Sequence, residues 1–160
     1  MLDITENQVL LSRKPQDLMV PNLEACIAFV LFCREFKIVG HVMPSFYRSR
    51  GSMKNLADWL GKHLESPVKF EIFGGANRLT QLAFIEWLGA NPKLINIKPV
   101  VFHPETTMDE REQKPQSDHG SDQCLHLRIE KNDVIVSIDA PVLGLKNPFL
   151  DAHRLEFREG

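Results

Sequence analysis

Residues 25–33 read Ala-Cys-Ile-Ala-Phe-Val-Leu-Phe-Cys, and this unbroken apolar run constrains the fold more than any other part of the chain. It includes β-branched and aromatic residues and is too short to cross a bilayer, so it predicts a strand buried on both faces. Residues 34–36 then turn the chain into a second apolar stretch at residues 37–43. The two stretches together predict a central hairpin.

Two helices are predicted after this hairpin. Ser52 is a candidate cap for a helix whose apolar stripe continues through Leu64 and ends before Pro67. Asn77 is a candidate cap for a second helix that ends near Gly89. Between them, residues 68–73 alternate as a strand does, and this strand stops at a Gly-Gly pair.

Further strands are expected at residues 8–12 and 94–102, and in a hairpin formed by residues 124–129 and 134–138. Pro99 interrupts the second of these strands, which indicates a sheet edge or a bulge. These elements predict an α/β (α+β) layered sandwich with a mixed, largely antiparallel sheet and two main helices.

Three segments are expected to lie outside the regular elements. Pro15 and Pro21 make residues 13–21 a connection that cannot be a continuous helix. Residues 104–123 are almost entirely polar and are read as a loop insertion without a core of its own. We therefore expect one domain over residues 1–139 and a C-terminal extension over residues 140–160.

Composition excludes several classes of protein. The 160 residues are 43% hydrophobic and 25% charged, which suits a single globular domain. A formal charge of −2 gives no overall field that would attract nucleic acid or an anionic membrane. We expect neither nucleic-acid binding nor membrane insertion. The N-terminus does not resemble a secretion signal and the three cysteines form no disulfide framework, so the expected location is the cytoplasm.

The most informative chemistry is the pair formed by Cys26 and His41. A cysteine becomes a nucleophile when a histidine within hydrogen-bond reach stabilises its thiolate. In the predicted hairpin, Cys26 near the start of one strand and His41 toward the end of the other lie at the same end of the sheet. The pattern alone nevertheless favours another interpretation, in which Cys26 is a small buried hydrophobe and His41 a structural histidine.

A family resemblance favours the catalytic interpretation of Cys26 and His41 over the structural one. Three blocks, at residues 24–32, 37–44 and 70–76, resemble in order and spacing the signature blocks of the bacterial chemoreceptor glutamine deamidase family, CheD. The first opens an apolar strand with Cys26, the second places His41 before Val-Met-Pro, and the third contains Phe-Gly-Gly-Ala. The resemblance covers roughly residues 8–138.

The resemblance implies that Cys26 attacks the carboxamide carbon of a protein glutamine, and that His41 acts as general base and acid. It further implies that backbone N–H groups near Cys26 hold the oxyanion, and that Gly74 and Gly75 shape the edge of the site. No cofactor or metal is implied. The implied substrates are cytoplasmic domains of chemoreceptors, and the implied partner is a CheC-like phosphatase.

Two departures from the family pattern bear on activity. Glu24 and Ala25 stand where the family has Gly-Ser, and the carboxylate would raise the thiol pKa. Val20 stands where the family has the threonine that orients its histidine, and valine cannot hydrogen-bond to imidazole. Asn22 and Ser45 are nearby polar candidates for that orienting role.

These departures leave two alternatives open: a catalytically degenerate CheD-like interaction module in a chemosensory complex, and a cysteine hydrolase of another specificity on the same fold.

Two other motifs are weaker candidates for a functional site than Cys26 and His41. The Gly-Gly-Ala-Asn turn lacks the pattern of a phosphate-binding loop, and His119, Cys124 and His126 lack the spacing of a metal site.

Overall fold

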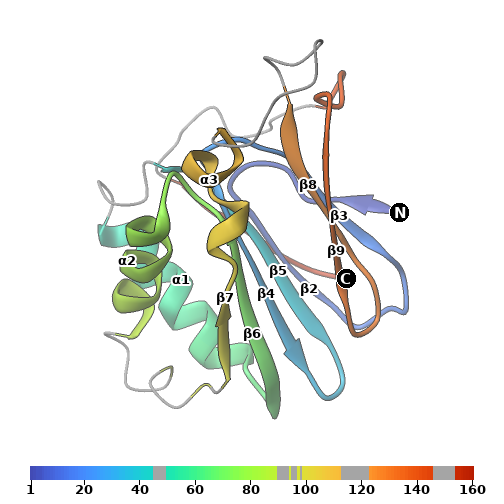
Figure 1. Ribbon diagram of the computed structural model, residues 1–160. Helices are drawn as coiled ribbons and strands as arrows, with labels where there is room; N and C mark the ends of the chain where they lie inside the picture. Colours follow the sequence, from blue (N-terminus) through green and yellow to red (C-terminus); the bar gives the residue numbers. More distant parts are fainter. Residues whose placement is uncertain (45–49, 90–93, 95–96, 98, 113–122, 146–153) are drawn as a thin grey trace.

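The computed structural model describes residues 1–44, 50–89, 94, 97, 99–112, 123–145 and 154–160, and it arranges them in three layers (Figure 1). A six-stranded sheet forms the middle layer. Two helices cover one of its faces and a four-stranded sheet covers the other. This confirms the layered α/β sandwich with mostly antiparallel strands and two main helices that the sequence predicts.

The six-stranded sheet has the order β10-β2-β5-β4-β6-β7. Its strands are β2 (Gln8–Ser12), β4 (Ile27–Cys33), β5 (Lys37–Val42), β6 (Pro67–Gly74), β7 (Val100–Phe102) and β10 (Glu156–Glu159). The predicted hairpin β4–β5 is central and antiparallel. Strand β7 pairs with β6 in parallel at the sheet edge, which is the position that Pro99 indicates. The strand is shorter than the predicted 94–102, because it begins directly after Pro99 and Leu94 lies in a turn.

The four-stranded sheet has the order β1-β3-β8-β9. Its strands are β1 (Leu2–Asp3), β3 (Leu18–Leu23), β8 (Cys124–Ile129) and β9 (Val134–Asp139). The hairpin β8–β9 is confirmed, but the prediction of a connection over residues 13–21 was wrong from residue 18 onward. Strand β3 tolerates Pro21 because its register with β8 shifts between Val20 and Leu23, where no ladder bond is needed from the proline.

The helices are α1 (Arg50–His63) and α2 (Arg78–Gly89). Their apolar faces pack on the six-stranded sheet, where the rings of Phe29 and Phe84 stack with centroids 5.7 Å apart. Asn77 caps α2 as predicted, because its Oδ1 accepts a hydrogen bond from the Thr80 N–H at 3.1 Å. Ser52 does not cap α1, since the helix begins two residues earlier.

The opposite face of the six-stranded sheet packs on the four-stranded sheet. We call the buried residues between them the inter-sheet core: Ile4, Leu10, Leu18, Val20, Leu23, Cys26, Ala28, Val30, Phe32, Val39, Phe73, Leu125, Leu127 and Ile129. Alternate residues of β4 enter this core and the core beneath the helices, so β4 is buried on both faces as its composition predicts.

The first part of the predicted polar loop is ordered, which corrects the expectation for residues 104–112. A 3₁₀ turn, η2 (Pro104–Thr106), leads into the short helix α3 (Met108–Glu112). Thr106 and Thr107 are buried, and the Arg111 guanidinium donates to the carbonyls of Leu23 and Glu24. These contacts attach a polar segment to the end of β3. Residues 113–122 of the predicted loop lie outside the described residues.

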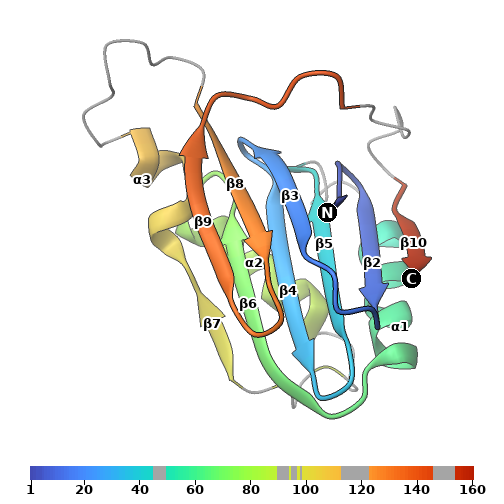
Figure 2. The same ribbon diagram turned by 90° about the vertical axis from the view of Figure 1, so that its right-hand side faces the viewer.

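Residues 154–160 do not form a separate appendage. Strand β10 pairs with β2 in parallel and so extends the six-stranded sheet (Figure 2). The Gly160 N–H donates to the Leu11 carbonyl at 2.8 Å, and the Phe157 ring stacks on Trp59 of α1 at 5.0 Å.

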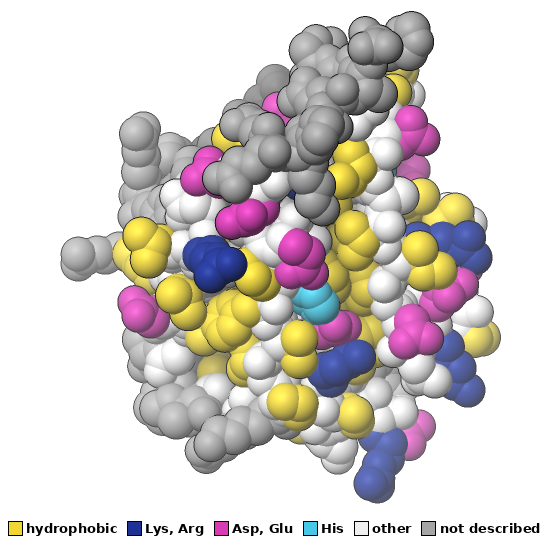
Figure 3. Space-filling view, viewed as in Figure 1, with side chains coloured by type: hydrophobic (Ala, Val, Ile, Leu, Met, Phe, Trp, Pro, Cys, Tyr) yellow, Lys and Arg dark blue, Asp and Glu magenta, His cyan; other side chains and the backbone are white. Residues whose placement is uncertain are grey.

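On the face shown in Figure 3, described acidic and basic side chains are interspersed. In the described parts of the chain, no helix is both long and apolar enough to cross a membrane.

Candidate active site

Cys26 and His41 lie at the same end of the six-stranded sheet, as the hairpin geometry predicts, and the register of β4 with β5 places them on the same face of it. His41 on β5 is directly opposite Ala28 on β4, and Cys26 precedes Ala28 by two residues. Side chains two residues apart share a face of a strand, and such diagonal cross-strand neighbours have Cα atoms about 7–8 Å apart. The backbones of Cys26 and His41 are therefore diagonal neighbours across the hairpin.

The thiol of Cys26 is nearly buried. Its residue is 6% exposed and belongs to the inter-sheet core. Burial, reinforced by the negative charges of Glu6 and Glu24, raises the pKa of Cys26 to about 12. Glu24 therefore acts in the direction that the sequence predicts, although burial is the larger cause. At neutral pH the thiol is protonated.

His41 is 1% exposed and is held in a defined tautomer. Its Nδ1 lies 3.1 Å from the Ile4 carbonyl oxygen. Because a carbonyl can only accept, Nδ1 carries the proton and Nε2 presents a lone pair. Burial lowers the pKa of His41 to about 4, although the hydrogen bond to Ile4 opposes this shift. The imidazole is neutral at pH 7.

The other ring nitrogen of His41 is unusual. Among the described residues, Nε2 is a buried atom without any hydrogen-bond partner, which also means that no hydrogen bond joins it to Cys26. A buried polar atom left unpaired costs about 1–3 kcal/mol, so such a group calls for an explanation in terms of the molecule's chemistry.

The Ile4 carbonyl takes the orienting place that the resemblance assigns to a threonine. Val20, at the threonine position, is fully buried in the inter-sheet core and offers no acceptor. Ile4 reaches His41 because β1 pairs with β3 and the Ile4 N–H donates to the Met19 carbonyl at 2.7 Å. Sequence reasoning missed this contact. Every residue carries a carbonyl, so no side-chain signal could have identified it.

Of the two polar residues considered for the orienting role, only Asn22 lies within the described residues. The Asn22 side chain pairs with the backbone of Val142, donating from Nδ2 at 2.9 Å and accepting at Oδ1 from the Val142 N–H at 2.8 Å. It therefore fastens the segment after β9 to β3, and both of its polar groups are occupied there. Ser45 lies outside the described residues.

Gly74 and Gly75 lie against the backbone of Cys26. The Gly75 N–H donates to the Cys26 carbonyl at 2.7 Å. Gly74 has a φ of 76°, and a Cβ atom there would lie 2.5 Å from the same carbonyl. A side chain at position 74 would thus push the turn away from Cys26.

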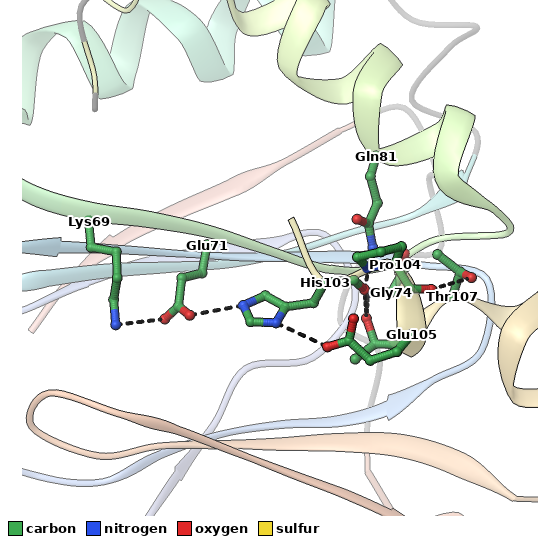
Figure 4. A network of polar contacts seen from close by, with 9 residues as sticks. Lys69, Glu71, Gly74, Gln81, His103, Pro104, Glu105 and Thr107 are labelled. Atoms are coloured by element: carbon green, nitrogen blue, oxygen red, sulfur yellow. Dashed lines mark hydrogen bonds and ion pairs between the residues drawn. The ribbon is translucent and has the colours of Figure 1, made fainter. Parts of the chain in front are cut away.

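A polar network, not anticipated from the sequence, supports this glycine turn (Figure 4). The Gly74 N–H donates to Thr106 Oγ1 at 2.9 Å, and Gln81 Nε2 donates to the Gly74 carbonyl at 2.8 Å and to the His103 carbonyl at 3.0 Å. These bonds tie the turn to η2 and α2.

The side chain of His103 continues this network along the sheet edge. Its Nε2 lies 2.9 Å from Glu71 and its Nδ1 lies 3.2 Å from Glu105, while Lys69 Nζ lies 3.5 Å from Glu71 (Figure 4). The imidazole stacks flat on Phe73, with centroids 4.2 Å apart. Phe73 belongs to the inter-sheet core, so the network fixes one wall of that core next to Cys26.

Of the candidate metal ligands, Cys124 and His126 lie within the described residues, and both have other partners. His126 accepts from the Asn22 N–H at Nδ1 and faces the carbonyls of Asp139 and Ala140 at Nε2, so both of its nitrogens have backbone partners. His119 lies outside the described residues. No group of three or more potential metal ligands occurs in the part of the chain that the structure describes.

The site thus contains a protonated buried thiol, a neutral imidazole fixed in one tautomer with a free lone pair, and a glycine turn bonded to the thiol residue. In comparisons with known proteins, neither a family model nor a curated protein matched the chain.

Proposed function

We propose that the protein is a cysteine amidohydrolase of the chemoreceptor glutamine deamidase type, which converts glutamine side chains of proteins to glutamate. The observation that carries this proposal is the state of His41. Its Nδ1 is occupied by the Ile4 carbonyl, and its unpaired Nε2 lies on the sheet face that also bears Cys26. This is the tautomer that a general base for a thiol requires.

The reaction has two halves. The sulfur of Cys26 forms a bond to the carboxamide carbon of glutamine while its proton passes to His41 Nε2. His41 then gives that proton to the leaving nitrogen, and ammonia departs as the thioester forms. Water, losing a proton to Nε2, attacks the thioester, and the proton returns to sulfur as glutamate leaves. Backbone N–H groups near Cys26 hold the oxyanion in each half.

The pKa values specify how the first step has to proceed. Burial raises the pKa of Cys26 to about 12 and lowers the pKa of His41 to about 4, so at pH 7 the thiol is protonated and the imidazole is neutral. The enzyme therefore holds no resting thiolate–imidazolium pair, and the thiol loses its proton to Nε2 as the sulfur attacks. Because Cys26 is 6% exposed, a substrate glutamine also requires some displacement of the side chains above it.

The substrates proposed are glutamines on the cytoplasmic domains of chemoreceptors, and the partner proposed is a CheC-like phosphatase. Both follow from the resemblance of the blocks around Cys26, His41 and Gly74. The cytoplasm is the corresponding location.

The test uses purified receptor cytoplasmic fragments as substrate. Ammonia release is measured together with the gain of about one dalton that each glutamine-to-glutamate conversion produces. Cys26→Ala and His41→Asn should abolish both signals. Cys33→Ala is the matched control, since Cys33 lies at the far end of the same strand, and it should retain them. Activity that survives Cys26→Ala would refute the proposal.

A second candidate function is a CheD-like interaction module without catalysis. It is favoured by the burial of the Cys26 thiol among the apolar side chains of the inter-sheet core. On this proposal the wild-type protein releases no ammonia from receptor fragments, but it is retained on immobilised receptor fragment or CheC-like phosphatase. Cys26→Ala should then bind as the wild type does. Failure to bind either protein would contradict it.

A further inference from the structure

A cavity of about 270 Å³ opens at the end of the sheet opposite Cys26. Three turns meet there: residues 12–17 after β2, residues 33–37 between β4 and β5, and residues 131–132 between β8 and β9. These turns lie toward the lower end of the molecule in Figure 2. Strand β4 separates Cys26 from Cys33, and seven residues of strand span about 23 Å, so the cavity is distinct from the candidate active site.

The lining of this cavity carries an excess of positive charge. Five lining residues are basic (Arg13, Lys14, Arg34, Lys37 and Lys131) and two are acidic (Asp17 and Glu35). Asp17 Oδ2 lies 3.2 Å from the guanidinium of Arg128, which is outside the lining and also pairs with Glu130 at 3.1 Å. Among the described residues, none of the five basic side chains forms an ion pair with a carboxylate.

The charge beneath the cavity is fixed in place. Lys37 is 6% exposed, and its Nζ donates to the carbonyls of Gln16 at 3.3 Å, Ile129 at 3.5 Å and Glu130 at 2.9 Å. Burial lowers the pKa of Lys37, against the opposing effect of the nearby carboxylates of Asp17 and Glu130. The ammonium uses its three donors on neutral carbonyls, so its charge contributes to the potential in the cavity.

The arginines have the chemistry of an anion site. Arg13 lies with its guanidinium 5.2 Å above the ring of Phe36, which also lines the cavity, and this contact restricts its orientation. Arg34 projects from the adjacent β4–β5 turn. A guanidinium presents a planar fork of donors that matches phosphate and carboxylate oxygens, and it is more weakly hydrated than an ammonium.

We propose that this cavity binds a small polyanion bearing phosphate or carboxylate groups, with Arg13 and Arg34 as its main ligands above the fixed charge of Lys37. The cavity is slightly smaller than most small-molecule pockets, so the part of the ligand that it holds is small. The site requires neither Cys26 nor His41 and is independent of the proposed deamidase activity.

Isothermal titration calorimetry at low ionic strength tests the proposal with two probes, inorganic pyrophosphate and citrate. At least one should bind saturably at one site per chain, and the probe that binds identifies phosphate or carboxylate as the preferred group. Arg13→Gln combined with Arg34→Gln should weaken binding by about tenfold or more. Lys54→Gln combined with Lys62→Gln is the control, since it removes equal charge from the exposed surface of α1.

A second measurement does not depend on any variant. Cys33 lines the cavity, so the bound anion should slow its alkylation by iodoacetamide at least severalfold. The proposal is overturned if neither probe binds, if both double variants weaken binding equally, or if saturating probe leaves the rate at Cys33 unchanged. Cys26→Ala should bind the probe as the wild type does, which separates this result from any failure of the deamidase assay.

Discussion

The neutral buried imidazole of His41 should make the protein lose stability as the pH falls below 7. In the unfolded chain a histidine has a pKa of about 6.5, whereas burial lowers the folded-state pKa of His41 to about 4. The unfolded state therefore binds the proton first. The contribution of neutral His41 is fully present above pH 6.5 and is lost as the pH falls from 6.5 toward 4.

The size of the effect follows from these two values. Each pKa unit corresponds to about 1.4 kcal/mol, so the full loss from this one residue is about 3 kcal/mol. Between pH 7 and pH 5 the loss is about 2 kcal/mol. A loss of this size is a large part of the stability of an ordinary domain.

Urea unfolding at several pH values, followed by the fluorescence of Trp59 and Trp87, measures this loss. His41→Asn keeps a donor that can reach the Ile4 carbonyl but does not titrate. Its free energy of unfolding should fall about 2 kcal/mol less than that of the wild type between pH 7 and pH 5. Other titrating groups are common to both proteins and cancel in the difference.

Val39→Ala is the matched control for this experiment. Val39 points into the inter-sheet core from the same strand, so its truncation leaves a cavity without removing a titrating group. Its stability curve should run parallel to that of the wild type. If the curve of His41→Asn also runs parallel to the wild type from pH 7 to pH 5, His41 is not held neutral by burial.

Two further predictions concern packing and thiol access. Gly40→Ala should lower the free energy of unfolding by about 1–3 kcal/mol, because the added Cβ would lie 2.2 Å from the ring of Phe29. At Gly51 an added Cβ meets no atom within 4 Å, so Gly51→Ala should leave the stability unchanged or raise it by up to about 1 kcal/mol. Urea unfolding measures both variants, and equal free energies of unfolding for the two would contradict the packing argument. In the free protein at pH 8, iodoacetamide should modify Cys33 well before Cys26, because Cys33 is partly exposed and burial raises its pKa only to about 11. Peptide mass spectrometry measures the order of modification. Faster reaction at Cys26 would show that its thiol is more accessible and more acidic than the structure indicates.

The sequence predicted those elements whose signal is local. The run at residues 25–33, the turn at residues 34–36 and the Asn77 cap each depend on neighbouring residues, and each was correctly placed. Both strands of the β8–β9 hairpin were also placed correctly, because the turn-forming residues 131–133 separate them, although β8 is buried at five of its six residues and β9 is largely exposed.

The errors concern elements whose form depends on distant partners. Strand β3 contains Pro21 and has no clear alternation, so only its pairing with β1 and β8 makes it a strand. Strand β10 reads Glu-Phe-Arg-Glu, which is too short and too polar to predict alone. The polar helix α3 is likewise held by contacts of Arg111 with the carbonyls of Leu23 and Glu24.

In the candidate site, too, local features could be predicted from the sequence and contacts with distant segments could not. The hairpin was sufficient to predict that Cys26 and His41 lie at the same end of the sheet, whereas their shared face depends on the register of β4 with β5. The hydrogen bond from His41 to Ile4 was beyond prediction, because it is made by a backbone group of a segment that only tertiary pairing brings there. The pKa values of the thiol and the imidazole depend on burial, which the four-stranded sheet provides.

The pairing of β10 with β2 has a consequence for how the protein folds. Gln8 and Glu156 are 148 positions apart in the sequence and are joined by a side-chain hydrogen bond. Among the described hydrogen bonds, those that join β10 to β2 close the longest loops, so forming this part of the sheet has the largest cost in chain entropy. Until β10 docks, β2 is an open edge strand of five residues that are all buried in the native state. Partly folded chains in which β10 has not yet paired therefore expose the apolar edge strand β2 to other chains, and aggregation during refolding should begin there.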